Sequence, residues 1–213
     1  MNIRFFRDAA LCLLQAAAVF SPALTSHAAP VDSSLVLLAT RALDESAFRQ
    51  TVVLAVPDGN GSHFGFVLNR PTEISLAELF PGDPASQHLK ARVHIGGPLL
   101  TNSVFALVRG KREPEAGTFP VTPDLFAALK GAAVDRVIAD RPDDARFFVG
   151  LVAWQPGELA NELRTGAWEP LDPEPDLVLS ADSSDMWNRL TTLAHAIRAS
   201  WTYSRTWPVV NWD

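Results

Sequence analysis

Cysteine is almost missing from this chain of 213 residues, because Cys12 is the only one. Cys12 lies in the first segment of the chain, so a protein that loses that segment contains no cysteine. The scarcity excludes a disulfide scaffold and a cysteine nucleophile. It is also compatible with an oxidising compartment, where a chain without cysteine forms no wrong disulfide.

Basic residues are also in short supply, with 18 Lys and Arg against 24 Asp and Glu and a formal net charge of −6. Affinity for nucleic acid comes mainly from neutralising phosphates, and no segment carries the Arg and Lys pattern of a recognition helix. We therefore expect no nucleic-acid partner. The same charge disfavours binding to anionic lipid headgroups.

Several chemical signatures are absent as well. The histidines beyond residue 28 stand at positions 63, 88, 94 and 195, and none of them pairs with another at a metal-ligand spacing. The sequence has no GxSxG motif around a serine nucleophile and no phosphate-binding loop. We expect no metal and no cofactor, although one sequence leaves an unrecognised catalytic dyad open.

Hydrophobic residues make up 47% of the chain and charged residues 20%, which is typical of a globular protein. We find no internal repeat, heptad pattern or low-complexity tract. A chain of this size builds its own core without disulfides or metal. The sequence predicts a single domain over residues 29–200, preceded by a leader and followed by a tail at 201–213 that contains Trp201, Trp207 and Trp212.

Residues 1–28 have the layout of a secretory signal peptide. Arg4 and Arg7 give a basic start, an apolar run covers residues 11–20, and Ser26 and Ala28 suit a cut after Ala28. The run is too short to cross a bilayer core of roughly 30 Å, and no other stretch of this kind follows it. We expect a periplasmic or secreted protein without a membrane span, or a cytoplasmic one if the leader is not cut.

The remaining sequence predicts a mixed α/β domain. Apolar runs predict strands at residues 35–40, 51–56, 64–69, 92–95, 103–109, 146–154 and 176–180. Helices are expected at residues 75–80, 123–130, 158–164 and 185–200. Ser75 and Glu78 have the spacing of a capping box, residues 57–62 read as a hairpin connection, and Gly131 is expected to stop the second helix.

The last predicted helix carries one apolar stripe. Its members recur at helical spacing and are Met186, Leu190, Leu193, Ala194 and Ile197. We expect this stripe to pack on the sheet. The three tryptophans of the tail either dock on the core or form an exposed patch for a partner.

Four blocks of residues follow one another in a set order. They are LLATRALDESAFRQTVVL (37–54), GFVLNRP (65–71), VHIGGPL (93–99) and VGLVAWQPGELANELRTGAWEP (149–170), with Trp187 opening a later helix. Together they resemble the bacterial YqgE/AlgH family over residues 35–197. The resemblance implies a bifurcated, mostly antiparallel β-sheet curled into a pseudo-barrel with helices packed outside. It implies no activity, and an alginate-regulator label attached to some members describes a genetic association.

The chain departs from the family pattern at the block around residue 150. The family commonly has Gly-Tyr-Ala-Gly-Trp where this chain has Gly-Leu-Val-Ala-Trp, and Gly-Gln-Leu where this chain has Gly-Glu-Leu. A family ligand site that used the Tyr or the Gln would therefore be altered here.

Six residues are candidate ligand-binding residues: Asn69, Arg70, His94, Gly96, Gly97 and Trp154. Arg70 either clamps a carboxylate or phosphate, or pairs with a local carboxylate such as Glu73 while Asn69 turns the chain. Gly96 and Gly97 either bring N–H groups to an anion or form a tight turn. Trp154 either floors a pocket or packs under the next helix.

These residues leave three functional hypotheses. The first is a non-enzymatic binding or accessory protein with a protein or small-molecule partner. The second is an enzyme whose site lies between Asn69, Arg70, Gly96 and Gly97, with His94 as acid or base. The third is a cytoplasmic regulator that does not bind DNA directly.

Overall fold

The computed structural model describes residues 31–82, 84–87, 89, 91–111 and 116–204, with side chains described as far as residue 196. The predicted signal peptide at 1–28 lies outside the described residues. So do most of the tail predicted at 201–213 and the side chain of Ile197.

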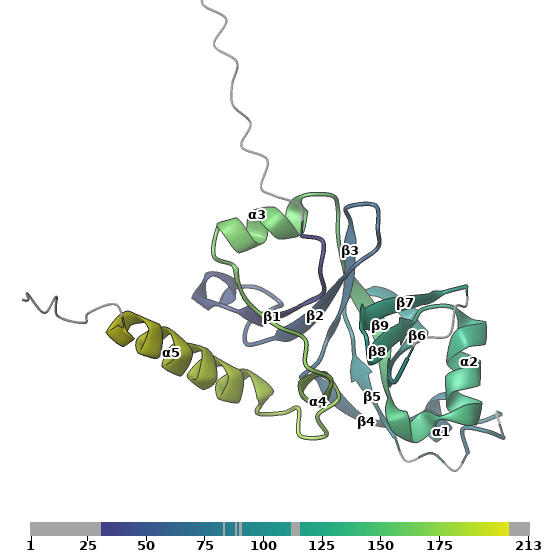
Figure 1. Cartoon of the computed structure of the whole chain (residues 1–213). Helices are drawn as coiled ribbons and strands as arrows, with labels where there is room; N and C mark the ends of the chain where they lie inside the picture. The colour runs from purple at the N-terminus through teal and green to yellow at the C-terminus, as the bar shows by residue number, and fades with distance from the viewer. Residues whose placement is uncertain (1–30, 83, 88, 90, 112–115, 205–213) are drawn as a thin grey trace, which may run out of the picture.

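Ten strands of the described chain join in one sheet with the order β10-β1-β2-β3-β9-β6-β8-β7, and β4 and β5 attach beside β9. Figure 1 shows this sheet curling around itself, with helices on its outer surfaces. The strands are β1 (Leu35–Ala39), β2 (Val52–Pro57), β3 (His63–Val67), β4 (Pro71–Ser75), β5 (Arg92–Ile95), β6 (Leu99–Arg109), β7 (Thr118–Thr122), β8 (Leu125–Ala128), β9 (Ala145–Trp154) and β10 (Trp168–Leu171).

Strand β9 is the point where the sheet divides. Residues 147–149 of β9 run parallel to β5, while residues 152–154 pair antiparallel with β3. Its other edge pairs antiparallel with β6. The remaining pairings are antiparallel, so the expectation of a bifurcated, mostly antiparallel and curled sheet is confirmed.

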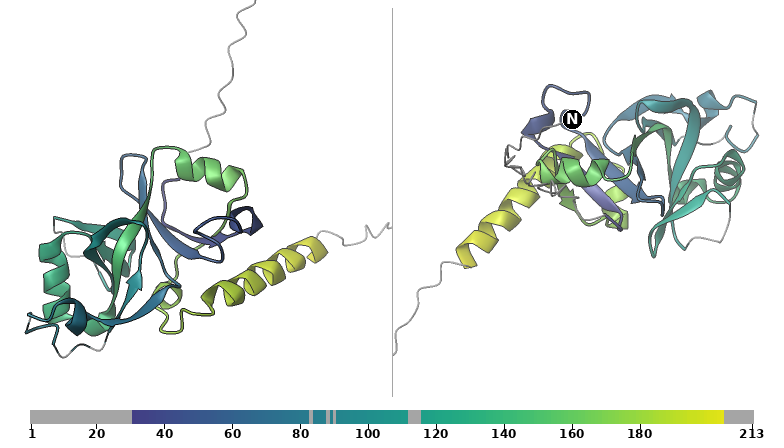
Figure 2. Two further views of the ribbon diagram at one scale, coloured as in Figure 1. Left: turned by 180° about the vertical axis from the view of Figure 1, so that it is seen from behind. Right: turned by 90° about the horizontal axis from the view of Figure 1, so that it is seen from above.

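The helices cover the outer surfaces of the sheet. They are α1 (Leu76–Leu79), α2 (Gly131–Asp140), α3 (Glu158–Arg164), α4 (Pro175–Val178) and α5 (Met186–Ser204), with 3-10 turns η1 (Arg41–Leu43) and η2 (Pro142–Asp144). Residues of α2 pack on β6 and β8, residues of α3 pack on β1 and β2, and α4 and α5 cover the opposite face of β1 to β3. Figure 2 shows α5 extending away from the body beyond its first turns.

Several local predictions are confirmed. Ser75 and Glu78 form both hydrogen bonds of a capping box, although the helix that they begin is only one turn long. The helix at 158–164 has its predicted bounds, and residues 57–62 connect the antiparallel strands β2 and β3. Met186, Leu190 and Ala194 of the predicted stripe are buried in the core.

Two predicted elements have the wrong type. Residues 123–130 are not a helix, because Leu125–Ala128 is strand β8, buried on both faces between β6 and β7. Short apolar runs of this kind fit a buried strand as well as a helix. Gly131 does not stop a helix but begins α2.

Residues 176–180 are likewise not a strand. Pro175 begins the one-turn helix α4, where a proline suits the first turn because that position needs no N–H donor. Leu193, expected in the buried stripe, is 52% exposed. Strands β4, β7 and β10 had no clear signal, since each carries a proline within its bounds.

Candidate functional site

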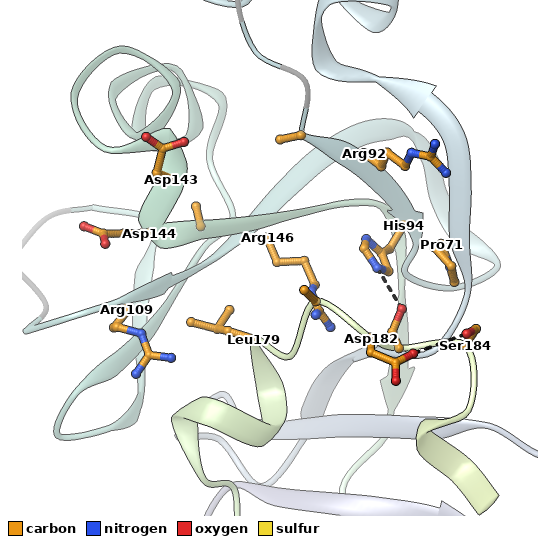
Figure 3. A pocket seen from close by; sticks show the side chains of 14 residues that line it. Pro71, Arg92, His94, Arg109, Asp143, Asp144, Arg146, Leu179, Asp182 and Ser184 are labelled. Atoms are coloured by element: carbon orange, nitrogen blue, oxygen red, sulfur yellow. Dashed lines mark hydrogen bonds between the residues drawn. The ribbon is translucent and has the colours of Figure 1, made fainter.

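A cavity of about 480 Å³ lies between β5, the beginning of β9, η2 and the connection from α4 to α5. Figure 3 shows His94 and Arg146 facing this hollow from two neighbouring strands. The connection at residues 179–184 closes the opposite side of the cavity. Its volume lies within the range of pockets for small molecules.

His94 reaches the cavity from β5 and is only 8% exposed. Its Nε2 lies 3.3 Å from the hydroxyl oxygen of Ser183, and its ring contacts the ring of Phe148 with centroids 5.7 Å apart. Its Nδ1 is buried and has no hydrogen-bond partner of regular geometry among the described residues. A buried polar atom without a partner is costly, so Nδ1 is a candidate for contact with a ligand or water.

Burial and charge keep His94 neutral. Burial lowers the pKa of the imidazole most, the positive charge of Arg146 lowers it further, and the pKa falls to about 4. The nearby backbone of Arg92 acts in the opposite direction and raises the pKa, without giving Nδ1 a hydrogen bond of regular geometry. At neutral pH the ring is therefore uncharged, with one nitrogen as donor and the other as acceptor.

Arg146 lies near the start of β9 and is 7% exposed. Its guanidinium donates to the backbone carbonyls of Leu68, at 3.4 Å, and of Ser180. Within the described part of the chain no ion pair joins it to a carboxylate. Burial lowers its pKa to about 10, so it stays positively charged at neutral pH.

The charged side chains at the rim of the cavity are mostly paired with one another or with neighbours. The pairs are Arg92 with Glu73 (2.7 Å), Arg109 with Asp176 (2.8 Å), Arg141 with Asp144 (3.3 Å) and Arg189 with Asp182 (2.9 Å). Asp143 also lines the rim and is exposed to water. The buried floor of the cavity thus carries the positive charge of Arg146, and the rim carries mixed charge.

Asn69 and Arg70 hydrogen-bond to the backbone of residues 47–52, between η1 and the start of β2. The side chain of Asn69 accepts from the N–H of Val52 and donates to the carbonyl of Gln50, both at 2.9 Å. Arg70 donates to the carbonyl of Ala47 at 2.7 Å. The expected pair between Arg70 and Glu73 is wrong, because Glu73 pairs with Arg92 across β4 and β5.

Gly96 and Gly97 lie where the chain passes closely over β9. A Cβ atom at Gly96 would stand 2.2 Å from the carbonyl oxygen of Gly150, and one at Gly97 would stand 2.3 Å from the backbone of Leu151. Neither Gly96 nor Gly97 has a positive φ, whereas Gly150 on β9 has a φ of 73°. Close packing of backbones, rather than a turn conformation, therefore explains the two glycines.

Trp154 ends β9 and is 3% exposed. Its indole N–H donates to a carboxylate oxygen of Glu162 at 2.8 Å, and the indole N–H of Trp168 donates to the same oxygen at 2.6 Å. Trp154 packs under α3 and also lines a smaller hollow of about 240 Å³.

The structure divides the six predicted residues between opposite faces. Arg70 and Gly97 line a hollow of about 270 Å³, which has Phe48 and Pro98 in common with the hollow at Trp154. His94 lines the large cavity instead, because successive residues of a strand point to opposite sides and Ile95 takes the other face. Asn69 and Gly96 line none of these three hollows.

Two residues of the cavity did not emerge from the sequence as candidates. Arg146 had a usable signal, since it is the one charged residue within the apolar run 146–154. Ser183 had none, because it lies 89 positions after His94 in a polar connection. In the described residues no cluster of three acidic, His or Cys side chains has the arrangement of a metal site.

A model of the AlgH-like family matches residues 36–196. The chain belongs to the AlgH-like family. Its relatives include a UPF0301 protein of Chlorobium luteolum, 31% identical over 158 residues that cover 72% of this chain and 80% of that one. A UPF0301 protein of Mycobacterium leprae is 31% identical over 161 residues, covering 74% and 79% of the two chains.

Two solved structures share the fold. The AlgH protein of Pseudomonas aeruginosa superposes with a TM-score of 0.62 at 22% identity, covering 83% of this chain and 94% of that one. A Corynebacterium diphtheriae protein gives a TM-score of 0.58 at 21% identity, covering 75% and 85%. The AlgH-like family is uncharacterised, so membership brings the fold and not an activity. None of the described helices is long and apolar enough to cross a bilayer.

Proposed function

We propose that this chain is a non-enzymatic binding protein that takes up a small polar ligand in the cavity between β5, β9 and the α4–α5 connection. The observation that carries the proposal is the buried pair at the cavity floor. Nδ1 of His94 lacks a partner, and Arg146 lacks a carboxylate among the described residues. Both side chains are more than nine-tenths buried, so their unfilled bonding capacity favours a ligand over bulk water.

The contact between Ser183 and His94 also resembles a nucleophile with its base, and this observation favours the alternative of an enzyme. The electrostatics oppose that alternative. A general base must become positively charged during the reaction, whereas burial and Arg146 hold the pKa of His94 near 4. No carboxylate hydrogen-bonds to the imidazole in the described chain to stabilise such a charge. The pair is better suited to holding a ligand than to activating Ser183.

Thermal unfolding of the full chain, measured with each compound of a panel of small metabolites, tests this proposal. We expect one class of polar compounds to raise the midpoint temperature of unfolding of the wild-type protein, because a ligand that binds only the folded state stabilises it. The Arg146→Met variant is expected to lose this rise. Steady turnover of any compound, abolished by Ser183→Ala, would instead establish the enzyme.

We also propose that the chain is exported and that residues 1–28 are removed. The basic start, the short apolar run and the small residues before position 29 support this proposal. The test is to recover the protein from cells, fraction by fraction, and determine its first residue. A first residue at Ala29 in the periplasm or medium supports export, and Met1 in the cytoplasm would contradict it.

A further inference from the structure

We infer that the group bound at the cavity floor is a single oxyanion, a carboxylate or a phosphate, held by the guanidinium of Arg146 and by Nδ1–H of His94. This inference rests on the proposed function, since it names the ligand class of the same cavity. It follows from the donors that remain unused there, from the tautomer of His94 and from the charges at the rim.

Arg146 presents unused N–H donors at the floor of the cavity. A guanidinium presents several N–H donors in a planar fork that matches a carboxylate or a phosphate. Arg146 donates two hydrogen bonds, to the carbonyls of Leu68 and Ser180, and has further N–H groups beyond these. Its positive charge has no carboxylate partner in the described chain. A buried charge is costly unless it is paired. An oxyanion supplies the missing charge and accepts the remaining hydrogen bonds.

The position of the ring proton decides what His94 offers to a ligand. The neutral ring has one donor and one acceptor nitrogen. When the Ser183 hydroxyl donates to Nε2, the proton lies on Nδ1, which is then a buried donor without an acceptor of regular geometry in the described chain. Arg146 and His94 therefore both present donors to the same cavity, which suits an oxygen acceptor and disfavours a cation.

Acidic side chains at the rim limit the size and charge of the ligand. The carboxylates of Asp143, Asp144 and Asp182 also line the cavity, toward its rim. They repel a large polyanion, but Asp144 and Asp182 are paired with arginines and Asp143 is exposed to water. A small molecule with one oxyanion at the floor and a neutral or amino-bearing remainder at the rim fits this distribution.

Isothermal titration calorimetry of the full chain tests the inference with sodium phosphate, sodium propionate, glycerol and ethanolamine as separate probes. We expect saturable one-to-one binding of phosphate or propionate with a dissociation constant of about 1 mM or tighter. The two anions distinguish a phosphate site from a carboxylate site. Glycerol and ethanolamine carry no oxyanion and are expected to give no saturable heat.

Matched variants assign the binding to the cavity. Arg146→Met is expected to weaken the anion about 10- to 100-fold, the range of a hydrogen bond to a charged group, and Arg146→Lys less, because it keeps the charge but not the fork. Arg164→Met, on α3 and outside the cavity, serves as the control and is expected to bind as wild type. If Arg146→Met does not fold, His94→Leu removes the second donor and is expected to weaken binding about tenfold.

The outcomes separate the two proposals. Binding of ethanolamine or glycerol in the cavity, without binding of either anion, would overturn the oxyanion and leave the binding protein in place. Anion binding that Arg146→Met, Arg146→Lys and His94→Leu leave unchanged would overturn the assignment of the site. If no probe binds and the metabolite panel also gives no shift, both proposals fail.

Discussion

Two residues account for the chemistry of the cavity, and their positions follow from strand geometry. His94 pairs with Phe148 in the parallel register of β5 and β9, so Arg146, two residues before Phe148, points to the same side. The imidazole therefore contacts the ring of Phe148, and the charge of Arg146 lies close enough to lower the pKa of the imidazole. The sequence indicated His94 through its place beside Gly96, and the lone charge of an apolar strand was available as a signal for Arg146.

The lowered pKa of His94 predicts that stability falls in mild acid. In the unfolded chain the ring titrates near 6.5, whereas in the folded protein its pKa is about 4. As the pH falls below about 6.5 the unfolded state binds a proton that the folded state rejects, so stability falls until pH 4. At pH 5 the loss is about 2 kcal/mol, and less where water in the cavity screens the charge.

Urea unfolding at pH 7 and pH 5, for the wild type and for His94→Gln, measures this contribution. The wild type is expected to lose more free energy of unfolding than the variant, which has no titrating ring. Equal losses in both proteins would show that His94 does not titrate between these pH values.

The close approach of Gly97 to β9 predicts that it tolerates no side chain. In Gly97→Ala the new Cβ would meet backbone atoms of Leu151 that cannot move without breaking the sheet. We expect a loss of about 3 kcal/mol or more in the free energy of unfolding. Gly82→Ala is the control, because a Cβ there meets nothing within 4 Å, and its change is expected to stay within about 0.5 kcal/mol. Similar stabilities of the two variants would contradict the close packing.

At the scale of elements, periodicity predicted the long or well-capped segments and failed for the short ones. Strand β9 is long and apolar, and α3 combines helical spacing with Gly166 after its end, so both emerged from the sequence. The run at 125–128 is a strand because β6 and β7 flank it on both sides, which is information from distant parts of the chain. The helix that begins at Pro175 is a single turn long. Periodicity does not distinguish so short a helix from a strand.

The start of α2 at Gly131 gives a test of the corrected element. A Cβ at Gly131 meets nothing within 4 Å, and alanine favours a helix over glycine. We expect Gly131→Ala to leave the protein as stable as wild type or to stabilise it by up to about 1 kcal/mol, measured by urea unfolding. A large loss would show that Gly131 has the role of a helix stop.

The carboxylate of Glu162 links α3 to two strands, because it accepts hydrogen bonds from Trp154 on β9 and Trp168 on β10. Glu162→Leu leaves two buried indole N–H groups without acceptors. We expect it to lower the free energy of unfolding by about 2 to 4 kcal/mol. Glu162→Gln keeps an acceptor oxygen of similar reach. Its loss in the free energy of unfolding is expected to be less than half that of Glu162→Leu. Equal effects of the two substitutions would contradict this role.

At the scale of the whole molecule, the family resemblance predicted the curled, bifurcated sheet, and the matching structures share it. The cavity itself could not be predicted from the sequence, because segments far apart in the chain form it. Its floor comes from residues 94 and 146, and its closing wall comes from residues 179–184, which had been predicted in part as a strand. Side chains alternate along β5, so His94 faces the large cavity while Ile95 faces the hollow of Arg70 and Gly97. The residues expected to form one site therefore line separate hollows.

The central claim is that the cavity between β5, β9 and the α4–α5 connection is where this chain binds an oxyanion. Backbone amide shifts of the full chain, followed by nuclear magnetic resonance while propionate or phosphate is added, test it most directly. We expect saturable changes concentrated at residues 92–95, 144–147 and 180–184. Changes concentrated instead at residues 47–48 and 97–101, around the apolar hollow of Arg70 and Gly97, would contradict it.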